Sequence, residues 1–190
     1  MAHFINLANA TVEELSVIAQ EQAKAAHLVA DRLVNHLNLL KGDFAGFPID
    51  RYTHCLQTAS RAYHDKRDAE YVVCALFHDM GDMLAPYNHG EFIAEVLRPY
   101  ISEQNRWILA HHGEFQGYYF WGKIGLNKNK RSEYEGNPYF DATVEFCEKY
   151  DCPSFDPEYP TLPIDTFIPL IKEVVGNLKV PNAYADIFNK

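Results

Sequence analysis

The feature that most constrains the fold is a helical spacing of apolar residues along most of the chain. Between residues 11 and 40 apolar side chains recur at three- and four-residue steps, the period of an amphipathic helix; these are Leu15, Ile18, Ala26, Val29, Leu33, Leu37 and Leu40. Thr11 and Glu14 form a capping-box pattern at its start, and Gly42 ends it. No segment shows the sustained alternation of a half-buried strand. The sequence therefore predicts an all-α protein.

The remaining helices are predicted between clusters of Gly, Pro and Asn. One begins near Asp50, and the others span residues 68–79, 90–97, 102–115, 140–150 and 164–178. A loop-rich segment follows Tyr118, and a proline-rich segment, "CPSFDPEYPTLP", precedes the last helix. Neither an internal repeat nor a low-complexity linker is present. We therefore expect a single domain over residues 1–190.

Charge and composition exclude several classes of protein. The net charge of -9 and the sequence pI near 5.4 repel phosphate polymers, which argues against nucleic-acid binding. No apolar run approaches the ~20 residues that span a bilayer, and the N-terminus lacks a signal-peptide pattern. The four cysteines form no CxxC pair and are expected to be reduced. We expect a cytoplasmic monomer or small homo-oligomer that acts on a small molecule, with neither a membrane nor a nucleic acid as partner.

The stretch "ALFHDMGDML", residues 75–84, sets His78 and Asp79 side by side directly after an apolar run. Adjacent helical positions point about 100° apart, so amphipathic packing alone does not need this pair. The chain has nine histidines, and His54, His89 and His111 also lie beside apolar residues, as does Asp151. Several buried imidazoles cannot easily all find neutral partners. A metal ion would satisfy them together.

The order of these residues resembles a known signature. His54, the pair His78–Asp79 and a later Asp151, with 24 residues between the first two histidines, are similar to the H…HD…D pattern of the HD-domain superfamily. The contexts "HCLQTA" and "ALFHDMGD" carry this resemblance. It implies a single HD-type helical bundle around one or two metals. It covers residues 44–170 and leaves an N-terminal amphipathic helix, within residues 1–41, outside.

Two further histidines make the layout resemble one branch, the mixed-valent diiron oxygenases, which include inositol oxygenase and the organophosphonate-cleaving oxygenases. "NPYFDATVEFCEKYD" resembles the segment that delivers the last aspartate of the organophosphonate branch. The resemblance implies a mixed-valent Fe2+/Fe3+ pair bridged by Asp79. Its expected ligands are His54, His78, Asp79, His89, His111 and Asp151. Because His111 and His112 are adjacent, either can be the fourth histidine; we favour His111, three residues after Ile108, and expect His112 to serve catalysis or support a ligand.

The chain departs from its relatives at positions that contact substrate. Asp82 stands where inositol oxygenase has a lysine, and Asp79, His112 and Asp82 are the predicted catalytic residues. Carboxylate or aromatic side chains replace basic groups at Phe115 and Glu148. Since ring faces and carboxylates attract cations, we expect a substrate with an amine or trimethylammonium group. The predicted substrate contacts are Phe44, Phe47, Phe115, Gln116, Tyr118 and Glu148.

Three functions stay open at this point. The resemblance implies an oxygenase that uses O2 to cleave a C–C or C–P bond of a small hydroxylated substrate. A phosphohydrolase that acts on a nucleotide or small phosphate ester, with Mn2+, Mg2+ or Zn2+ activating water, is the alternative; its phosphate would be bound by Lys123, Lys128, Lys130 and Arg131. A metal-stabilised binding module is the third, favoured if the aromatic residues 118–121 pack against the first helix.

Overall fold

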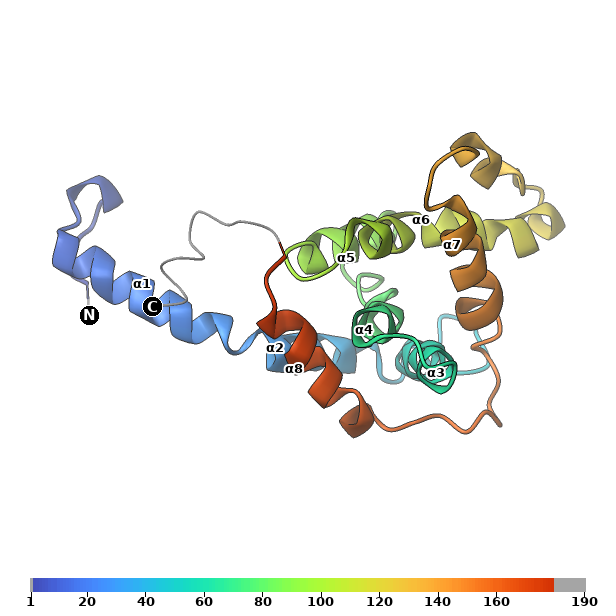
Figure 1. The fold of residues 1–190 in the computed structure, drawn as a ribbon, viewed down its shortest axis with the longest axis horizontal. Helices are drawn as coiled ribbons and strands as arrows, with labels where there is room; N and C mark the ends of the chain where they lie inside the picture. Colours follow the sequence, from blue (N-terminus) through green and yellow to red (C-terminus); the bar gives the residue numbers. More distant parts are fainter. Residues whose placement is uncertain (1, 180–190) are drawn as a thin grey trace.

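The computed structural model describes residues 2–179, and every regular element in that range is a helix (Figure 1). The all-α prediction is confirmed. Residues 1 and 180–190, which the predicted single domain includes, lie outside the described residues. The α-helices are α1 Val12–Ala26, α2 Val29–Leu37, α3 Arg51–His64, α4 Ala69–Phe77, α5 His89–Leu97, α6 Glu103–Phe120, α7 Phe140–Phe146 and α8 Ile168–Gly176.

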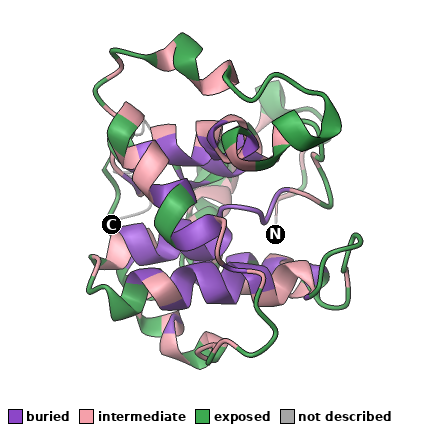
Figure 2. Cartoon of the chain, turned by 90° about the vertical axis from the view of Figure 1, so that its right-hand side faces the viewer, coloured by how far each residue is buried: buried purple, intermediate pink, exposed green. Residues whose placement is uncertain are grey.

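Helix α4 is the centre of the bundle. Its residues from Tyr71 to Phe77 are all buried, and α3, α6 and α8 pack around it. Helix α5 lies along α6, and α7 packs against α6 as well. Figure 2 shows the buried residues gathered on the inner faces of these helices. Because His78 and Asp79 directly follow α4, they enter the interior of the bundle together.

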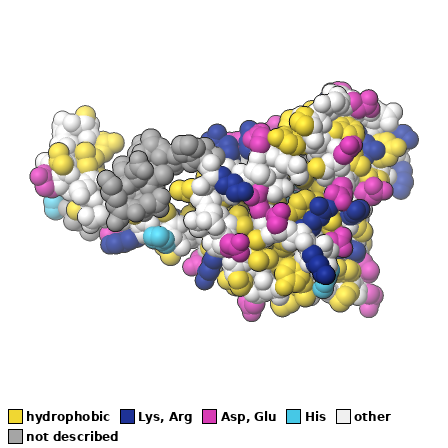
Figure 3. All heavy atoms as spheres, viewed as in Figure 1, with side chains coloured by type: hydrophobic (Ala, Val, Ile, Leu, Met, Phe, Trp, Pro, Cys, Tyr) yellow, Lys and Arg dark blue, Asp and Glu magenta, His cyan; other side chains and the backbone are white. Residues whose placement is uncertain are grey.

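The long N-terminal helix predicted over residues 11–40 is in fact two helices. Thr11 and Glu14 make the expected capping box, but α1 ends at Ala26 and α2 starts at Val29. Helix α1 extends away from the bundle and contains no buried residue (Figure 1). Hydrophobic side chains are exposed at that end of the molecule, as Figure 3 shows. Of these two helices, only α2 buries its apolar face, which packs against α8.

The starts of three helices are fixed by capping residues. The Asp50 carboxylate accepts a hydrogen bond from the Thr53 N–H at 2.7 Å, and Asp68 accepts one from the Tyr71 N–H at 2.8 Å. Ser102 does the same for α6. These side chains satisfy N–H groups that lack a partner in the first turn. In the described residues no helix has the length and apolar character needed to cross a bilayer.

Two predicted helices end differently from expectation. Helix α6 continues to Phe120, five residues past the predicted end. The helix predicted over residues 140–150 is α7 followed by a π-helix, Cys147–Asp151, in which the Cys152 N–H donates to the Cys147 carbonyl at 2.9 Å. Such wider turns occur often at functional sites. Here the π-helix ends on Asp151.

Candidate metal centre

Polar side chains from five elements converge in the middle of the bundle. His54 comes from α3, His89 is the first residue of α5, and His112 lies on α6. His78 and Asp79 follow α4, and Asp151 ends the π-helix. All of these are buried except His89, whose side chain is 24% exposed.

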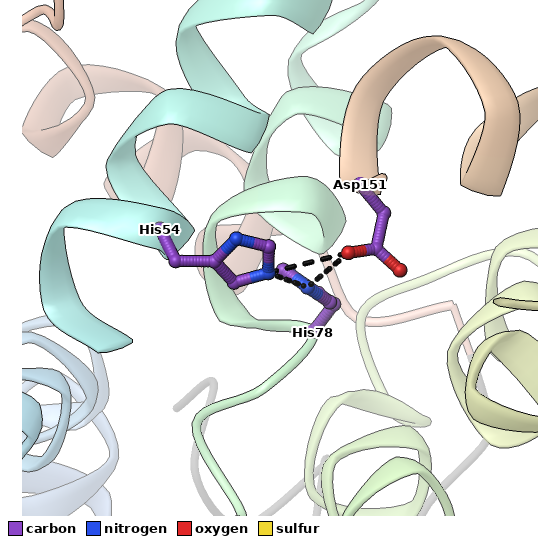
Figure 4. Close-up of side chains that lie close together, drawn as sticks. All are labelled: His54, His78 and Asp151. Carbon is purple, nitrogen blue, oxygen red and sulfur yellow. Dashed lines mark hydrogen bonds and ion pairs between the residues drawn. The ribbon is translucent and has the colours of Figure 1, made fainter. Parts of the chain in front are cut away.

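One half of the centre is formed by His54, His78 and Asp151, which point toward one another in Figure 4. The two Nε2 atoms lie 3.0 Å apart, and Asp151 Oδ1 lies 3.2 Å from His54 Nε2 and 3.6 Å from His78 Nε2. The Asp79 Oδ2 atom completes this half, 3.3 Å from His54 Nε2 and 3.5 Å from His78 Nε2.

The other half is formed around the second oxygen of Asp79. Asp79 Oδ1 lies 3.4 Å from His89 Nε2 and 3.1 Å from His112 Nε2. These two nitrogens are 3.2 Å apart. Asp79 therefore stands between two histidine pairs and presents one carboxylate oxygen to each.

The contacts of each Nδ1 atom, the ring nitrogen that points away from the centre, show which nitrogen faces inward. His54 Nδ1 lies 2.8 Å from the Ser154 carbonyl oxygen, His78 Nδ1 2.8 Å from that of Ala75, and His112 Nδ1 2.7 Å from that of Leu109. Because a carbonyl only accepts, each Nδ1 carries a hydrogen, and Nε2 is the nitrogen that faces the cluster. The facing Nε2 atoms lie 3.0 to 3.2 Å apart, so a proton or a metal cation must lie between the two rings of each pair.

Both carboxylates of the centre are ionised although they are buried. Burial alone would raise the pKa of Asp79, but His78, His112, His54 and Arg51 hold it well below its usual range. Burial likewise opposes ionisation of Asp151, whereas the adjacent His54 and His78 lower its pKa. Among the described residues no hydrogen-bond partner reaches the buried Asp151 Oδ2.

His54 balances part of the negative charge of the two buried carboxylates. Burial alone would lower its pKa, but hydrogen bonds and charge from Asp151 and Asp79 raise it to about 10. Imidazole and carboxylate are suitable ligands for divalent iron, manganese and zinc. The residues therefore fit a metal site: overlapping groups of His and Asp have ligand atoms within 4.8 Å of one another, and two of these groups include Asp79.

The structure corrects the choice between the two adjacent histidines. His111 lies outside the cluster: its ring stacks on Trp107 with centroids 3.7 Å apart, and its Nδ1 lies 3.0 Å from the Trp107 carbonyl oxygen. His112 shares the buried face of α6 with Ile108, Leu109 and Phe115. The fourth histidine of the centre is thus His112.

A cavity of about 590 Å3 opens onto the metal centre. Of the predicted substrate contacts, Phe47 and Gln116 line it, as does the predicted catalytic residue Asp82. Gln116 Nε2 also donates to Asp151 Oδ1 at 2.8 Å. Sequence reasoning missed Asp43, Arg51 and Phe155, which also line the cavity, and left open whether the aromatic residues 118–121 do; of these, Tyr119 and Phe120 line it.

The other four predicted substrate contacts lie elsewhere. Phe115 is fully buried in the core against Tyr134 and Phe140. Tyr118 is covered by the Arg131 guanidinium, 3.5 Å from its ring centroid. Phe44 and Glu148 are exposed and do not line the cavity.

Two of the missed residues differ in whether the sequence could have identified them. Arg51 precedes His54 by three residues, so a helix places both on one face, and this spacing could have identified it. Phe155 stacks on the His54 ring with centroids 4.3 Å apart. It lies in the proline-rich segment, where no periodic pattern marks a buried position.

The four basic residues predicted to bind phosphate do not line the cavity. Arg131 and Lys128 lie over the Tyr118 ring, and Lys130 pairs with Glu133. Arg51 is the one cationic side chain among the described residues that line the cavity. Its guanidinium pairs with Asp82 and lies 3.1 Å from Asp79 Oδ2.

Comparison with known proteins agrees with this arrangement. The HD domain family model matches residues 51–141, a range that includes His54, the pair His78–Asp79, His89 and His112. No curated protein matches the chain. The match supports the predicted relationship to the HD-domain superfamily. An HD domain implies a metal-dependent enzyme that binds divalent metal ions.

Proposed function

We propose that this chain, with its HD domain over residues 51–141, is a non-haem diiron oxygenase that cleaves a C–C or C–P bond of a small hydroxylated substrate with O2. The observation that carries the proposal is the position of Asp79, whose two oxygens face separate histidine pairs. A mononuclear HD site needs only His54, His78, Asp79 and Asp151. It would leave the inward lone pairs of His89 and His112 without a cation.

Two irons, when bound, supply redox chemistry with O2 and Lewis acidity toward a substrate hydroxyl. The protein's part is to hold and shield them. Asp79 brings the two halves together, and the amide of Gln116 orients Asp151. Phe155, stacked between His54 and Phe47, covers one side of the centre.

The cavity favours a substrate that carries positive charge. Asp43 lines it together with the rings of Phe47, Tyr119 and Phe120, while the Asp82 carboxylate is already paired with Arg51. Carboxylates and ring faces attract an ammonium group, and a desolvated cation–π contact is worth about 2 kcal/mol. An amine or trimethylammonium group fits this surface, with the substrate hydroxyl directed to the metals.

A phosphohydrolase is the second candidate, because Arg51 lines the cavity and its buried Nε has no hydrogen-bond partner among the described residues. Arginine commonly binds phosphate through paired N–H groups. Two carboxylates already engage this guanidinium, however, so its charge is largely neutralised before any phosphate arrives.

Metal analysis separates the two functions. We expect protein purified without oxygen to bind two irons per chain and, after partial oxidation, to give the paramagnetic resonance signal of a mixed-valent pair. One zinc or magnesium per chain, together with phosphate release from nucleotides or phosphate esters, would reject the oxygenase.

Substrate charge is tested with two alcohols of nearly the same shape, choline and its neutral carbon analogue 3,3-dimethylbutan-1-ol. Choline should perturb the resonance signal at roughly tenfold lower concentration, as expected from a cation–π contact of 1–2 kcal/mol. Asp43→Asn should reduce that preference. Equal effects of the two alcohols on the wild-type signal would reject a cationic substrate.

A further inference from the structure

His89 is held differently from the other three imidazoles of the metal centre. The outer nitrogens of His54, His78 and His112 meet main-chain carbonyl oxygens. The outer nitrogen of His89 meets a side chain instead: its Nδ1 lies 2.9 Å from Asp82 Oδ1. Only this imidazole therefore depends on a replaceable group for its orientation and tautomer.

Packing restrains His89 less than its partners. Its side chain is 24% exposed, whereas those of His54, His78 and His112 are at most 2% exposed. It is also the first residue of α5, after Asn88, whose side chain does not cap the helix. Asp82 supplies the restraint that burial gives to the other rings.

The turn after α4 is shaped to bring Asp82 to this position. A Cβ at Gly81 would lie 2.8 Å from the His89 carbonyl oxygen and 3.1 Å from its Cα, so the turn rests directly on the start of α5. The Asp82 N–H donates to the Asp79 carbonyl at 3.1 Å. Only glycine allows this approach.

Both oxygens of Asp82 are already engaged. One faces His89 Nδ1, and the other pairs with the Arg51 guanidinium, which also lies 3.1 Å from Asp79 Oδ2. Asp82 meets the nitrogen of His89 that points away from the cluster, so it supports a ligand rather than acting as one. These contacts leave it poorly placed for the catalytic role that the sequence suggested.

We propose that Asp82, held by Arg51, is a positioning residue that sets the affinity of the second metal site, formed by Asp79, His89 and His112. The inference rests on the proposed dinuclear function. A carboxylate that accepts the Nδ1–H fixes the tautomer and makes Nε2 a better ligand, and the loss of such a partner costs 10- to 100-fold in metal affinity. The first site, built on rings bound to main-chain carbonyls, does not depend on Asp82.

Calorimetric titration of the chelator-treated full chain with Mn2+ tests this. We expect Asp82→Ala to bind the first ion like wild type and the second about 10- to 100-fold more weakly. Asp82→Asn should lose less, since an amide oxygen still accepts the Nδ1–H. Glu148→Gln is the matched control, because this carboxylate is exposed and does not line the cavity. It should bind both ions like wild type.

The results separate a failure of the positioning role of Asp82 from a failure of the dinuclear function. If wild type binds two ions and both Asp82 variants do so with unchanged affinity, the positioning role is wrong while the dinuclear centre stands. Equal weakening of both sites, with a lower melting temperature in the metal-free state, would mean that Asp82 supports the fold and would also overturn the inference. A wild-type chain that binds a single Mn2+ would reject the dinuclear function itself.

Discussion

A single methyl group at Gly90 tests whether the close approach of α5 and α6 builds the second half of the centre. A Cβ there would lie 2.5 Å from the Leu109 carbonyl oxygen, 3.2 Å from that of Ala110 and 3.3 Å from His112 Cε1. The two nearest atoms belong to the main chain of α6. They cannot rotate away, so Gly90→Ala must push the two helices apart.

The cost can be estimated from two opposing effects. Overpacking of a tight contact costs about 1–3 kcal/mol, and alanine returns up to about 1 kcal/mol through its better helix propensity. The net effect, from about zero to a loss of about 2 kcal/mol, lowers the melting temperature by up to roughly 8 °C for a chain of this size. Because His89 precedes Gly90, the same displacement lengthens the 3.2 Å separation between His89 Nε2 and His112 Nε2. Affinity for a second Mn2+ should fall as well.

Thermal unfolding followed by circular dichroism on metal-free protein measures the first effect, and Mn2+ titration measures the second. Gly176→Ala is the control, because Gly176 ends α8 and a Cβ there meets nothing within 4 Å. It should be neutral or stabilising by up to about 1 kcal/mol. If Gly90→Ala matches this control in both measurements, the helix contact does not position the metal centre.

Two further perturbations address single side chains. His112→Ala should reduce the metal content from two ions per chain to one, whereas His111→Ala should keep both, and equal loss in the two variants would contradict the assigned helix face. Burial alone would raise the pKa of Glu70, but hydrogen bonds from Lys179, Ser102 and Asn105 lower it below 4.5. It therefore stabilises the fold above pH 4.5, and this contribution disappears as the pH falls through the lowered value. Glu70→Gln should unfold in less urea near pH 7 and lose less stability on acidification; an unchanged pH profile would contradict this.

The starts of helices were predictable because they are encoded locally. Asp50, Asp68 and Ser102 each offer an oxygen to an N–H of the first turn, and this chemistry needs no tertiary contact. The break between α1 and α2 was not predictable, since neither glycine nor proline marks residues 27 and 28. Helix α2 packs into the bundle and α1 does not. The apolar series is continuous through α2, whereas in α1 it is interrupted between Ile18 and Ala26.

The sequence distinguished only weakly which of His111 and His112 lies on the buried face of α6. His111 and His112 both lie three or four residues from Ile108 and Phe115, so these neighbours do not separate them. Leu109 does, because it stands three residues before His112 and only two before His111. The substrate residues were harder, since much of the cavity wall comes from loops, and its helical part, Gln116, Tyr119 and Phe120, lies on one face of α6 beyond the helix end predicted at residue 115.

The direction of the last carboxylate depends on the kind of helical turn that carries it. Residues 147–151 form a turn closed by a hydrogen bond that spans five residues, one more than an α-helix uses. If the same five residues formed an ordinary α-helical turn, each would advance by about 100° instead of the smaller step of the wider turn, and Asp151 would point away from His54 and His78. Substitutions that convert this turn to an α-helix would thus weaken the first metal site even though every ligand is retained.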